Sequence, residues 1–433
     1  SFPDVAGNLD TDKGGFMVVW SSEESNGSGT YDIKAQIYDE TKVDGSRHVL
    51  TGEINSVNTT TNYTQKYPKV ASLTNGNYVV VWESDNNNDG NHNIYGQIIT
   101  SIGNFSGAET AVNSVTTYSQ NYPVVAPISA DDPTNPGGFV VGFMSEYDDT
   151  NSFYDIKYRL FNSSFVAQTS DVSVTSNVTL SSGLVSIEGL NVGGFVVSYY
   201  GNYEGQASSF TNDTQINGLT SGTTATVGTL GDPTVSTVEL THVNGFFIEG
   251  EEIQGQTYLK IEKIGSVTQS GSSGTISDTA TITLSTSIKR IAVAKYNCNS
   301  TSLVYQKTVN SSTLIDDAER AADSATNFIR DNTVFTYKRP MANISTLNDD
   351  NYIVTWTNGA VPSVYYRKFQ TSDGTPLTDE TKIDTTYSEV KQRNQAVCNL
   401  KTKSRSSAGF CIVWESEGQD LSTIPDSGIF NMR

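Results

Sequence analysis

The chain has 433 residues, of which 36% are hydrophobic and 17% are charged, and its formal net charge at pH 7 is −20. A surface this acidic repels phosphate groups and anionic lipids, which argues against binding to nucleic acid. No run of 18 apolar residues occurs, which argues against a transmembrane helix. The N-terminus has no signal-peptide pattern, so we expect a processed or trimmed start.

The predicted strands follow one repeating order from the N-terminus. A unit begins with a short strand such as 67–73, and a polar turn at Asn75-Gly76 leads into an apolar second strand. An alternating third strand follows, such as 93–98, and a weaker fourth strand, such as 108–113, ends the unit. Asn-Gly favours a type I′ hairpin. The apolar second strand is expected to be buried on both faces, and the third strand to lie nearer solvent.

All four tryptophans end such a second strand, and weaker copies of the strand fill the interval between residues 82 and 356. The eight equivalent positions, 50 to 62 residues apart, are 20, 82, 143, 199, 250, 306, 356 and 414. Solenoid repeats are shorter and sandwich domains are longer than this period. The pattern therefore predicts an all-β fold, a β-propeller of eight four-stranded antiparallel blades whose last blade is incomplete.

These units predict one repeat domain over residues 1–433. The blades are expected to start near residues 1, 66, 121, 182, 232, 288, 338 and 393. The best-preserved units are neighbours only if the last unit lies beside the first, which indicates a closed ring. A short helix is expected as an insertion at 312–323, where Ser312 or Thr313 is a possible N-cap.

The last unit ends at 427–433, which matches a third strand, so its fourth strand is missing. An unprotected strand edge favours pairing with another chain. We therefore expect that the native protein continues beyond these ends, or that a neighbouring subunit donates a strand. Donation from head to tail would give a homopolymer. The alternative is a short edge that is simply solvated.

Asn-x-Ser/Thr sequons are frequent in the predicted loops and outer strands, where a glycan would not disturb a core. They begin at Asn26, Asn58, Asn62, Asn104, Asn162, Asn177, Asn212, Asn299, Asn310 and Asn343. Glycans are expected first at Asn58, Asn62, Asn104 and Asn310. The sequons predict a secreted glycoprotein, located outside the cell or on its surface.

Two further sets of residues suggest sites. Asp85, Asn87 and Asp89 match the first half of a calcium loop, in which alternate oxygens face the ion. Gly96 stands where that loop has its bidentate glutamate, so an ordinary polar turn is the alternative to Ca²⁺. Cys398 and Cys411 lie on neighbouring strands and could form a disulfide at a non-hydrogen-bonded pair, or could be buried thiols.

Motifs of known enzyme chemistry are absent from the sequence. The three histidines, His48, His92 and His242, are isolated, and neither a Gly-x-Ser-x-Gly elbow nor a phosphate-binding loop occurs. We therefore predict no catalytic residue and no enzyme. A pair of carboxylates that only the fold brings together stays open.

The unit Gly14-Gly15-Phe16-x-Val18-x-Trp20, followed by Tyr31-Asp32-Ile33-x-Ala35-Gln36, resembles repeats in large secreted or cell-surface proteins of microbes. It resembles more loosely the integrin-type (FG-GAP-like) propeller repeats, which have calcium loops. The resemblance is strong only in units one, two, three, seven and eight. It implies an extracellular, non-catalytic role in adhesion or in a surface coat.

We accordingly expect a structural component of a coat, appendage or fibril, or an adhesion module, with neighbouring protein subunits as partners. The alternative is a lectin-like propeller that binds glycans with aromatic residues such as Tyr158, Tyr365 or Tyr366. The third possibility is a glycosidase. No cofactor other than Ca²⁺ is expected.

Overall fold

The structure is a computed structural model of the whole chain. The residues that it describes are 3–9, 14–23, 29–38, 53–54, 56–61, 63–85, 91–146, 154–174, 183–202, 213–218, 221–228, 237–247, 252–253, 256–268, 279–285, 289–298, 302–310, 342–358, 362–383, 392–400, 409–417 and 427–432. The helix expected at 312–323 lies outside them. In the described part of the chain, no helix is long and apolar enough to cross a membrane.

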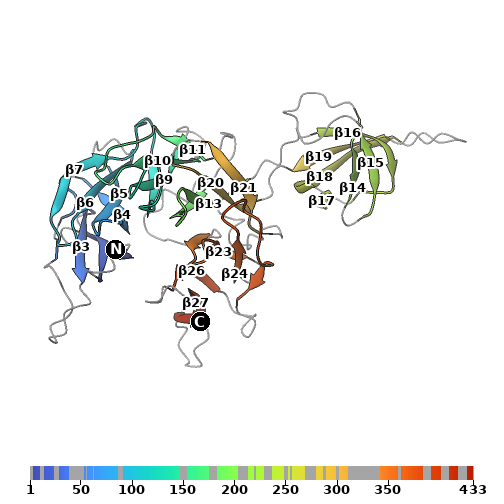
Figure 1. Cartoon of the computed structure of the whole chain (residues 1–433). Coiled ribbons are helices and arrows are strands. Elements are labelled where there is room, and N and C mark those ends of the chain that lie inside the picture. Colours follow the sequence, from blue (N-terminus) through green and yellow to red (C-terminus); the bar gives the residue numbers. More distant parts are fainter. Residues whose placement is uncertain are drawn as a thin grey trace, which may run out of the picture. The chain divides into compact units, whose positions relative to one another are not determined.

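The chain divides into two compact units, residues 1–201 with 291–433, and residues 202–290. The sheets of the first unit are named blades here and lie in chain order (Figure 1). Blade 1 comprises β1 (Asp4–Gly7), β2 (Phe16–Glu23) and β3 (Tyr31–Tyr38). Blade 2 comprises β4 (Gln65–Ser72), β5 (Tyr78–Ser84), β6 (Asn93–Ile99) and β7 (Phe105–Ala111). Blade 3 comprises β8 (Gln120–Pro127), β9 (Phe139–Glu146), β10 (Tyr154–Phe161) and β11 (Val172–Ser173).

The other three blades follow. Blade 4 comprises β12 (Gly183–Gly189), β13 (Phe195–Asn202), β20 (Lys289–Tyr296) and β21 (Leu303–Thr308). Blade 5 comprises β22 (Asn343–Thr346), β23 (Tyr352–Asn358), β24 (Ser363–Phe369) and β25 (Thr381–Lys382). Blade 6 comprises β26 (Gln392–Asn399), β27 (Phe410–Glu417) and β28 (Ser427–Met432).

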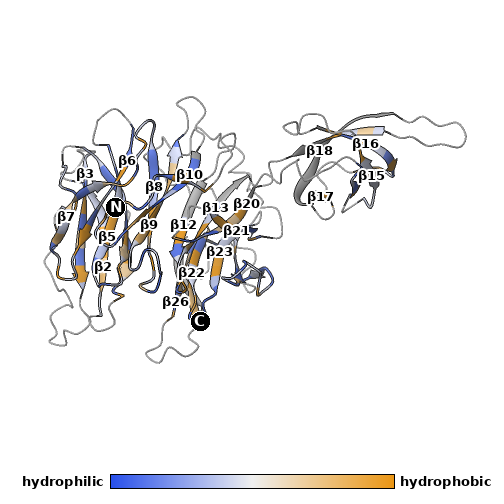
Figure 2. Cartoon of the chain, turned by 45° about the horizontal axis from the view of Figure 1, so that its top comes forward, coloured by the Kyte–Doolittle hydropathy of each residue, from blue (hydrophilic) through white to orange (hydrophobic). Residues whose placement is uncertain are grey.

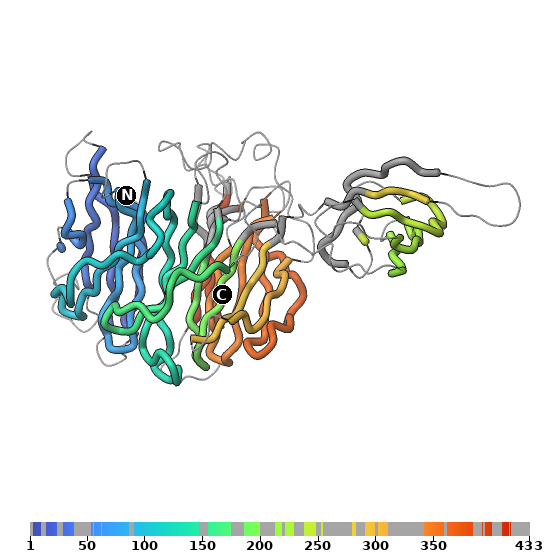
Figure 3. Tube along the Cα trace, turned by 90° about the horizontal axis from the view of Figure 1, so that it is seen from above, coloured from blue at the N-terminus to red at the C-terminus, as the bar shows by residue number. Residues whose placement is uncertain are grey.

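The first strands of consecutive blades pack against one another, from β1 and β4 to β22 and β26. The blades therefore succeed one another along the unit, and Figure 3 shows this order by colour. This arrangement, together with antiparallel blades of up to four strands, confirms the predicted all-β propeller class.

In blades 2, 3 and 5 the second strand is buried on both faces, as predicted, whereas β2 of blade 1 alternates between buried and half-buried side chains. All seven residues of β5 and all seven of β23 are buried, because another blade covers each face of their sheet. Figure 2 shows these strands as predominantly hydrophobic. The third strand of blade 1 instead alternates between buried and half-buried side chains.

The turn between β4 and β5 is not the type I′ turn that we expected. The N–H of Leu73 donates to the carbonyl of Asn77, which encloses three residues, and Gly76 has a φ of 81° while Asn75 keeps a negative φ. A three-residue loop needs a left-handed residue at one position only, and glycine occupies that position here.

The described sheets differ from the expected eight blades. Blade 4 takes its first two strands from the fourth sequence unit and its last two, β20 and β21, from the sixth. The run around Leu303 and Val304, which we interpreted as a buried second strand, is an edge strand with both side chains exposed. The starts expected near 232 and 288 therefore do not begin blades, whereas the other six do.

The second unit contains the fifth sequence unit together with the end of the fourth. The chain therefore divides into two compact units, where we expected one domain over 1–433. It holds a six-stranded sheet in the order β14-β15-β16-β19-β18-β17. These strands are β14 (Gln215–Asn217), β15 (Thr224–Val227), β16 (Thr237–Asn244), β17 (Glu252–Ile253), β18 (Gln256–Thr268) and β19 (Thr279–Ser285). The unit has its own core around Val227, Leu240 and Ile282, which are fully buried.

Candidate functional site

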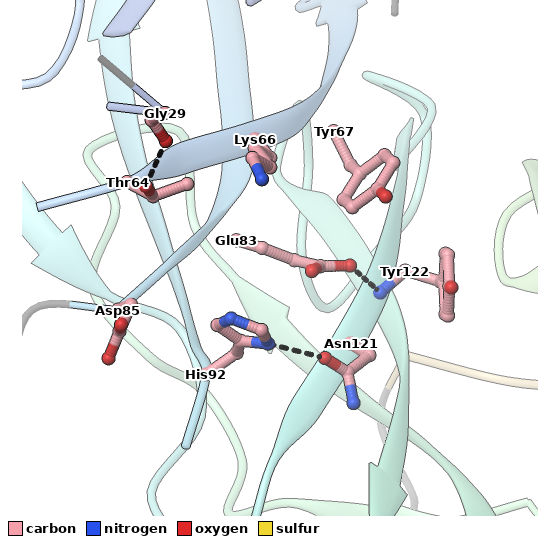
Figure 4. A pocket seen from close by; sticks show the side chains of 9 residues that line it. All are labelled: Gly29, Thr64, Lys66, Tyr67, Glu83, Asp85, His92, Asn121 and Tyr122. Atoms are coloured by element: carbon pink, nitrogen blue, oxygen red, sulfur yellow. Dashed lines mark hydrogen bonds between the residues drawn. The ribbon is translucent and has the colours of Figure 1, made fainter. Parts of the chain in front are cut away.

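A polar cavity of about 220 Å³ lies where blades 1, 2 and 3 meet, at the beginning of the first strands of blades 2 and 3. Nine residues line it, shown in Figure 4: Gly29, Thr64, Lys66, Tyr67, Glu83, Asp85, His92, Asn121 and Tyr122. The cavity combines carboxyl groups, a lysine, a histidine and aromatic rings. These side chain types can carry acid–base chemistry and ligand binding together.

A short repeated motif positions the two tyrosines. Gln65-Lys66-Tyr67-Pro68 opens β4, and Gln120-Asn121-Tyr122-Pro123 opens β8. The strand register shifts at both motifs. Proline has no N–H for the ladder, so a bulge forms at this place.

The bulges hold both tyrosines in a conformation that non-glycine residues rarely adopt. Tyr67 has a φ of 54° and Tyr122 a φ of 52°. Their rings meet across the blade boundary with centroids 5.5 Å apart. A left-handed non-glycine residue costs about 1–3 kcal/mol, and such residues gather at functional sites. The strained pair therefore marks this cavity as a candidate site.

Glu83 lies in the middle of the cavity (Figure 4). It is 4% exposed, and one carboxyl oxygen, Oε1, accepts a hydrogen bond of 2.5 Å from the N–H of Tyr122. Burial raises the pKa of Glu83 to about 8, although this hydrogen bond and the charge of Lys66 act in the opposite direction. Glu83 is therefore largely protonated at neutral pH.

Burial also shifts the pKa values of two neighbours of Glu83, namely Lys66 and Tyr67. Burial lowers the pKa of Lys66, although the charge of Glu83 acts to raise it. Burial and the charge of Glu83 raise the pKa of Tyr67 to about 12. Each group is thus shifted toward its neutral form, which is the behaviour of a site shielded from water.

Two polar atoms that line the cavity have unused hydrogen-bonding capacity. Asp85 Oδ1, an acceptor, and Asn121 Nδ2, a donor, are buried without a partner among the described residues. Asn121 Oδ1 lies 3.2 Å from Nδ1 of His92 and fixes the orientation of that ring. Buried polar atoms are normally satisfied, so a ligand with both donor and acceptor groups would complement this cavity.

The predicted calcium residues are placed only in part. Asp85 lines the cavity, whereas Asn87 and Asp89 lie outside the described residues. Within the described ranges, no group of three or more His, Cys, Asp or Glu side chains could hold a metal ion. Calcium at this loop stays a prediction.

The predicted glycosylation residues differ in how far they are exposed. Asn104 is exposed in the turn between β6 and β7, and Asn162 is half-buried with Oδ1 accepting from two backbone N–H groups of its own turn. Asn343 is half-buried and donates to the carbonyl of Gln395. The residues that lie outside the described part are Asn26, Asn62, Asn177, Asn212 and Asn299.

Asn58 and Asn310, expected among the first glycan carriers, are instead buried. Asn58 Oδ1 accepts from the N–H of Ile33, and its Nδ2 donates to Asp32 and to the carbonyl of Thr60. Asn310 Oδ1 accepts in the same way from Ile291. The non-sequon residue Asn113 makes the equivalent bond to Ile94, so this amide is a structural clamp for the third strand of a blade.

Cys398 and Cys411 lie directly opposite each other, and the structure records both as free thiols. The N–H of Leu400 donates to the carbonyl of Gly409, two residues along the same register. The cysteines therefore occupy a hydrogen-bonded pair, not the non-hydrogen-bonded pair that we expected a disulfide to need. A disulfide between them stays a prediction.

The aromatic residues that we expected to bind sugars do not line this cavity. Tyr158 is fully buried against Phe195, 4.9 Å between centroids, and Tyr365 stacks on Trp356. Tyr366 packs against Phe410. Tyr67 and Tyr122 were not among the residues predicted from the sequence, although the repeated Gln-x-Tyr-Pro motif was a usable signal. Of the three histidines, His92 reaches the cavity, His242 lies in the second unit and His48 is outside the described residues.

Comparison with known proteins gives matches among solved structures only. No protein-family model matches the chain, and the search of curated proteins gives no match. An alpha-L-arabinanase of Penicillium chrysogenum is 12% identical at a TM-score of 0.41, covering 82% of this chain and 76% of its own. A protein of unknown function from Dyadobacter fermentans is 7% identical at a TM-score of 0.46, and the match covers 100% of this chain and 93% of that protein. An alpha-L-arabinofuranosidase of Fusarium graminearum is 11% identical at a TM-score of 0.37, and the match covers 84% of this chain and 80% of that protein.

These matches contradict two of our expectations, the non-catalytic coat or adhesion role and the absence of an enzyme. The matched chains include ones named as an alpha-L-arabinanase, an alpha-L-arabinofuranosidase and a family-43 glycoside hydrolase. At these identities the likeness concerns the course of the chain alone. Glu83, Asp85 and the two tyrosines come from three strands and one loop, so the sequence alone does not show that they lie together.

Proposed function

We propose that the chain is a glycoside hydrolase and that the Glu83 cavity is its catalytic site. The observation that carries this proposal is a buried carboxyl group with a pKa of about 8, in a cavity lined by the tyrosine pair Tyr67 and Tyr122. A carboxylic acid that is protonated at neutral pH can serve as general acid for the leaving oxygen of a glycosidic bond. Aromatic rings provide apolar faces for sugar rings.

The second carboxyl group would be that of Asp85. Glu83 is the next-to-last residue of β5 and Asp85 directly follows the strand, and both line the cavity. In this proposal the two carboxyl groups hold a water molecule between them, as inverting enzymes require. The unpartnered Asp85 Oδ1 and Asn121 Nδ2 would bind the water and a sugar hydroxyl.

The reaction then has a simple balance. Glu83 donates its proton to the leaving oxygen while the bond from that oxygen to the anomeric carbon breaks. Asp85 takes a proton from the attacking water, whose oxygen forms the new bond to the same carbon. Exchange of protons with solvent restores both carboxyl groups.

The test is hydrolysis of a polysaccharide panel that includes arabinan, by the wild type and by Glu83→Gln and Asp85→Asn. The proposal expects each substitution to lower the rate roughly 10²–10⁴-fold. Glu53→Gln is the matched control, because Glu53 is exposed and pairs only with Lys34 in a surface salt bridge. Binding of glycans without turnover by the wild type would show a lectin in place of an enzyme.

An extracellular location is proposed alongside this function, and the exposed sequon at Asn104 supports it. Mapping of glycans by mass spectrometry on protein from its native source tests it. Occupancy of Asn104 agrees with passage through a secretory pathway, and a bare Asn104 removes this support.

A further inference from the structure

Lys66 brings a positive charge to the Glu83 cavity without a carboxylate partner among the described residues. Its Nζ lies 4.9 Å from the centroid of the Tyr31 ring, a cation–π contact with blade 1. None of the salt bridges between described residues involves Lys66. The lysine is half-buried, so water reaches it only in part. A cation in this position leaves room for an anionic ligand.

Glu83 does not supply the missing counter-charge at neutral pH. Its charge acts to raise the pKa of Lys66, but burial outweighs it and lowers that pKa. Burial also raises the pKa of Glu83 to about 8, so this carboxyl group keeps its proton. An ammonium group that is partly removed from water without a counter-charge costs free energy, which a bound anion would offset.

The acidic groups of the chain leave space for an anion beside Lys66. In Figure 4, Lys66 and Tyr67 lie above Glu83, whereas Asp85 and His92 lie below it. An anionic group beside Lys66 is therefore kept apart from the carboxyl group of Asp85, and it favours the protonated form of Glu83. The formal net charge of −20 opposes the approach of a polyanion, but at physiological salt charges more than about 8 Å away are largely screened.

The other walls of the cavity suit a sugar ring. Tyr67 and Tyr122 provide aromatic faces. Asn121 is 2% exposed, and its Nδ2 is a buried donor without a partner among the described residues. A sugar hydroxyl can accept from Asn121, and an anionic group on the same sugar can accept from Lys66 in a stronger, charge-assisted hydrogen bond.

We propose that the Glu83 cavity binds an acidic glycan and that Lys66 pairs with the anionic group of its sugar, a carboxylate or a sulfate ester. The choice of a glycan as ligand rests on the proposed function. Lys66 is then the residue that determines specificity, because it distinguishes an acidic sugar from a neutral sugar of the same ring.

The test measures binding of sugars that differ only at the sixth carbon. Galacturonate, galactose 6-sulfate and galactose, and the three corresponding derivatives of glucose, are titrated into Glu83→Gln protein, in which the glutamine is uncharged and cannot act as an acid. An acidic sugar should bind roughly 10- to 100-fold more tightly than its neutral counterpart, the range of a hydrogen bond to a charged group. In the same background, Lys66→Met should abolish this difference, whereas Lys66→Arg, which keeps the charge, should retain it. The carboxylate and sulfate arms show which anion the cavity takes.

Lys69→Met is the matched control, because Lys69 lies on the same strand but pairs with Asp4 and does not line the cavity. It should leave every affinity unchanged. Equal affinities for acidic and neutral sugars, or no binding of any acidic sugar, would overturn the inference. Binding of acidic sugars through Lys66, without hydrolysis of acidic polysaccharides by the wild type, would support this contact and overturn the proposed hydrolase instead.

Discussion

At the scale of single residues, Glu83 departs from the ordinary chemistry of a carboxyl group. It is buried beside Lys66, and the hydrogen bond from Tyr122 does not offset the cost of burying its charge. A neutral Glu83 both suits general acid catalysis and makes the stability of the folded chain depend on pH.

The expected pH dependence follows from the direction of the pKa shift. The pKa of Glu83 is about 8 in the folded chain and near its ordinary value of 4.5 in the unfolded chain. The folded state therefore holds this proton more tightly, and the contribution to stability is full below about pH 4.5 and is lost as the pH rises through 8. Urea unfolding at pH 5, 6.5 and 8 should show a free energy of unfolding that falls by a few kcal/mol.

Glu83→Gln provides the control for this measurement, because glutamine cannot ionise. Its free energy of unfolding should decrease less with pH than that of the wild type. Equal slopes for both proteins would mean that Glu83 titrates normally, and would remove the basis for its role as an acid.

Asn58 shows how a sequon can be a structural residue. Asn58→Ala should lower the free energy of unfolding by about 1–3 kcal/mol, because the buried N–H of Ile33 loses its acceptor. Asn104→Ala, in an exposed turn, should change it by less than about 0.5 kcal/mol. Denaturant unfolding of both variants, in unglycosylated protein, measures the difference, and similar losses would contradict the clamp.

At the scale of strands and blades, an arginine joins neighbouring blades. Arg159 of β10 donates through Nε to the carbonyl of Thr169 in its own blade and through Nη1 to that of Val112 in blade 2. Arg367 of β24 repeats the arrangement with the carbonyls of Thr378 and Val309. The planar guanidinium group reaches two carbonyls at once, which a lysine cannot do.

Arg159→Lys should therefore destabilise the chain by about 1–3 kcal/mol, since a buried carbonyl loses its donor. Lys157→Met, two residues away on the same strand, is the control and should have a smaller effect. Thermal unfolding followed by circular dichroism measures both variants. A larger loss for Lys157→Met would show that the arginine does not join the blades.

At the scale of the whole molecule, the second unit is an insertion within blade 4. β13 ends at Asn202 and β20 begins at Lys289, and the two strands are neighbours in one sheet. A short connection can therefore replace the unit without moving either strand.

Replacement of residues 204–287 by a short Gly/Ser linker should leave a folded propeller. The unit has its own core cluster, which shares no residue with the cluster that contains Val196 and Val293 of blade 4. Circular dichroism and a cooperative unfolding transition check the outcome. Loss of the transition in the shortened chain, with the wild type as reference, would show that blade 4 depends on the second unit.

The sequence by itself determined the all-β class, the buried second strands and six of the blade starts. Local pattern is sufficient for these features, because a strand buried on both faces needs a continuous apolar run such as 78–82. The blade count needed the tertiary structure. The edge strand at 303–308 begins with an apolar run, as a central strand does. Only the position of the strand in its sheet shows that it lies at the edge. The candidate site also depended on the fold, because Glu83 comes from blade 2 and Asn121 and Tyr122 come from blade 3, and burial between the blades gives them their chemistry.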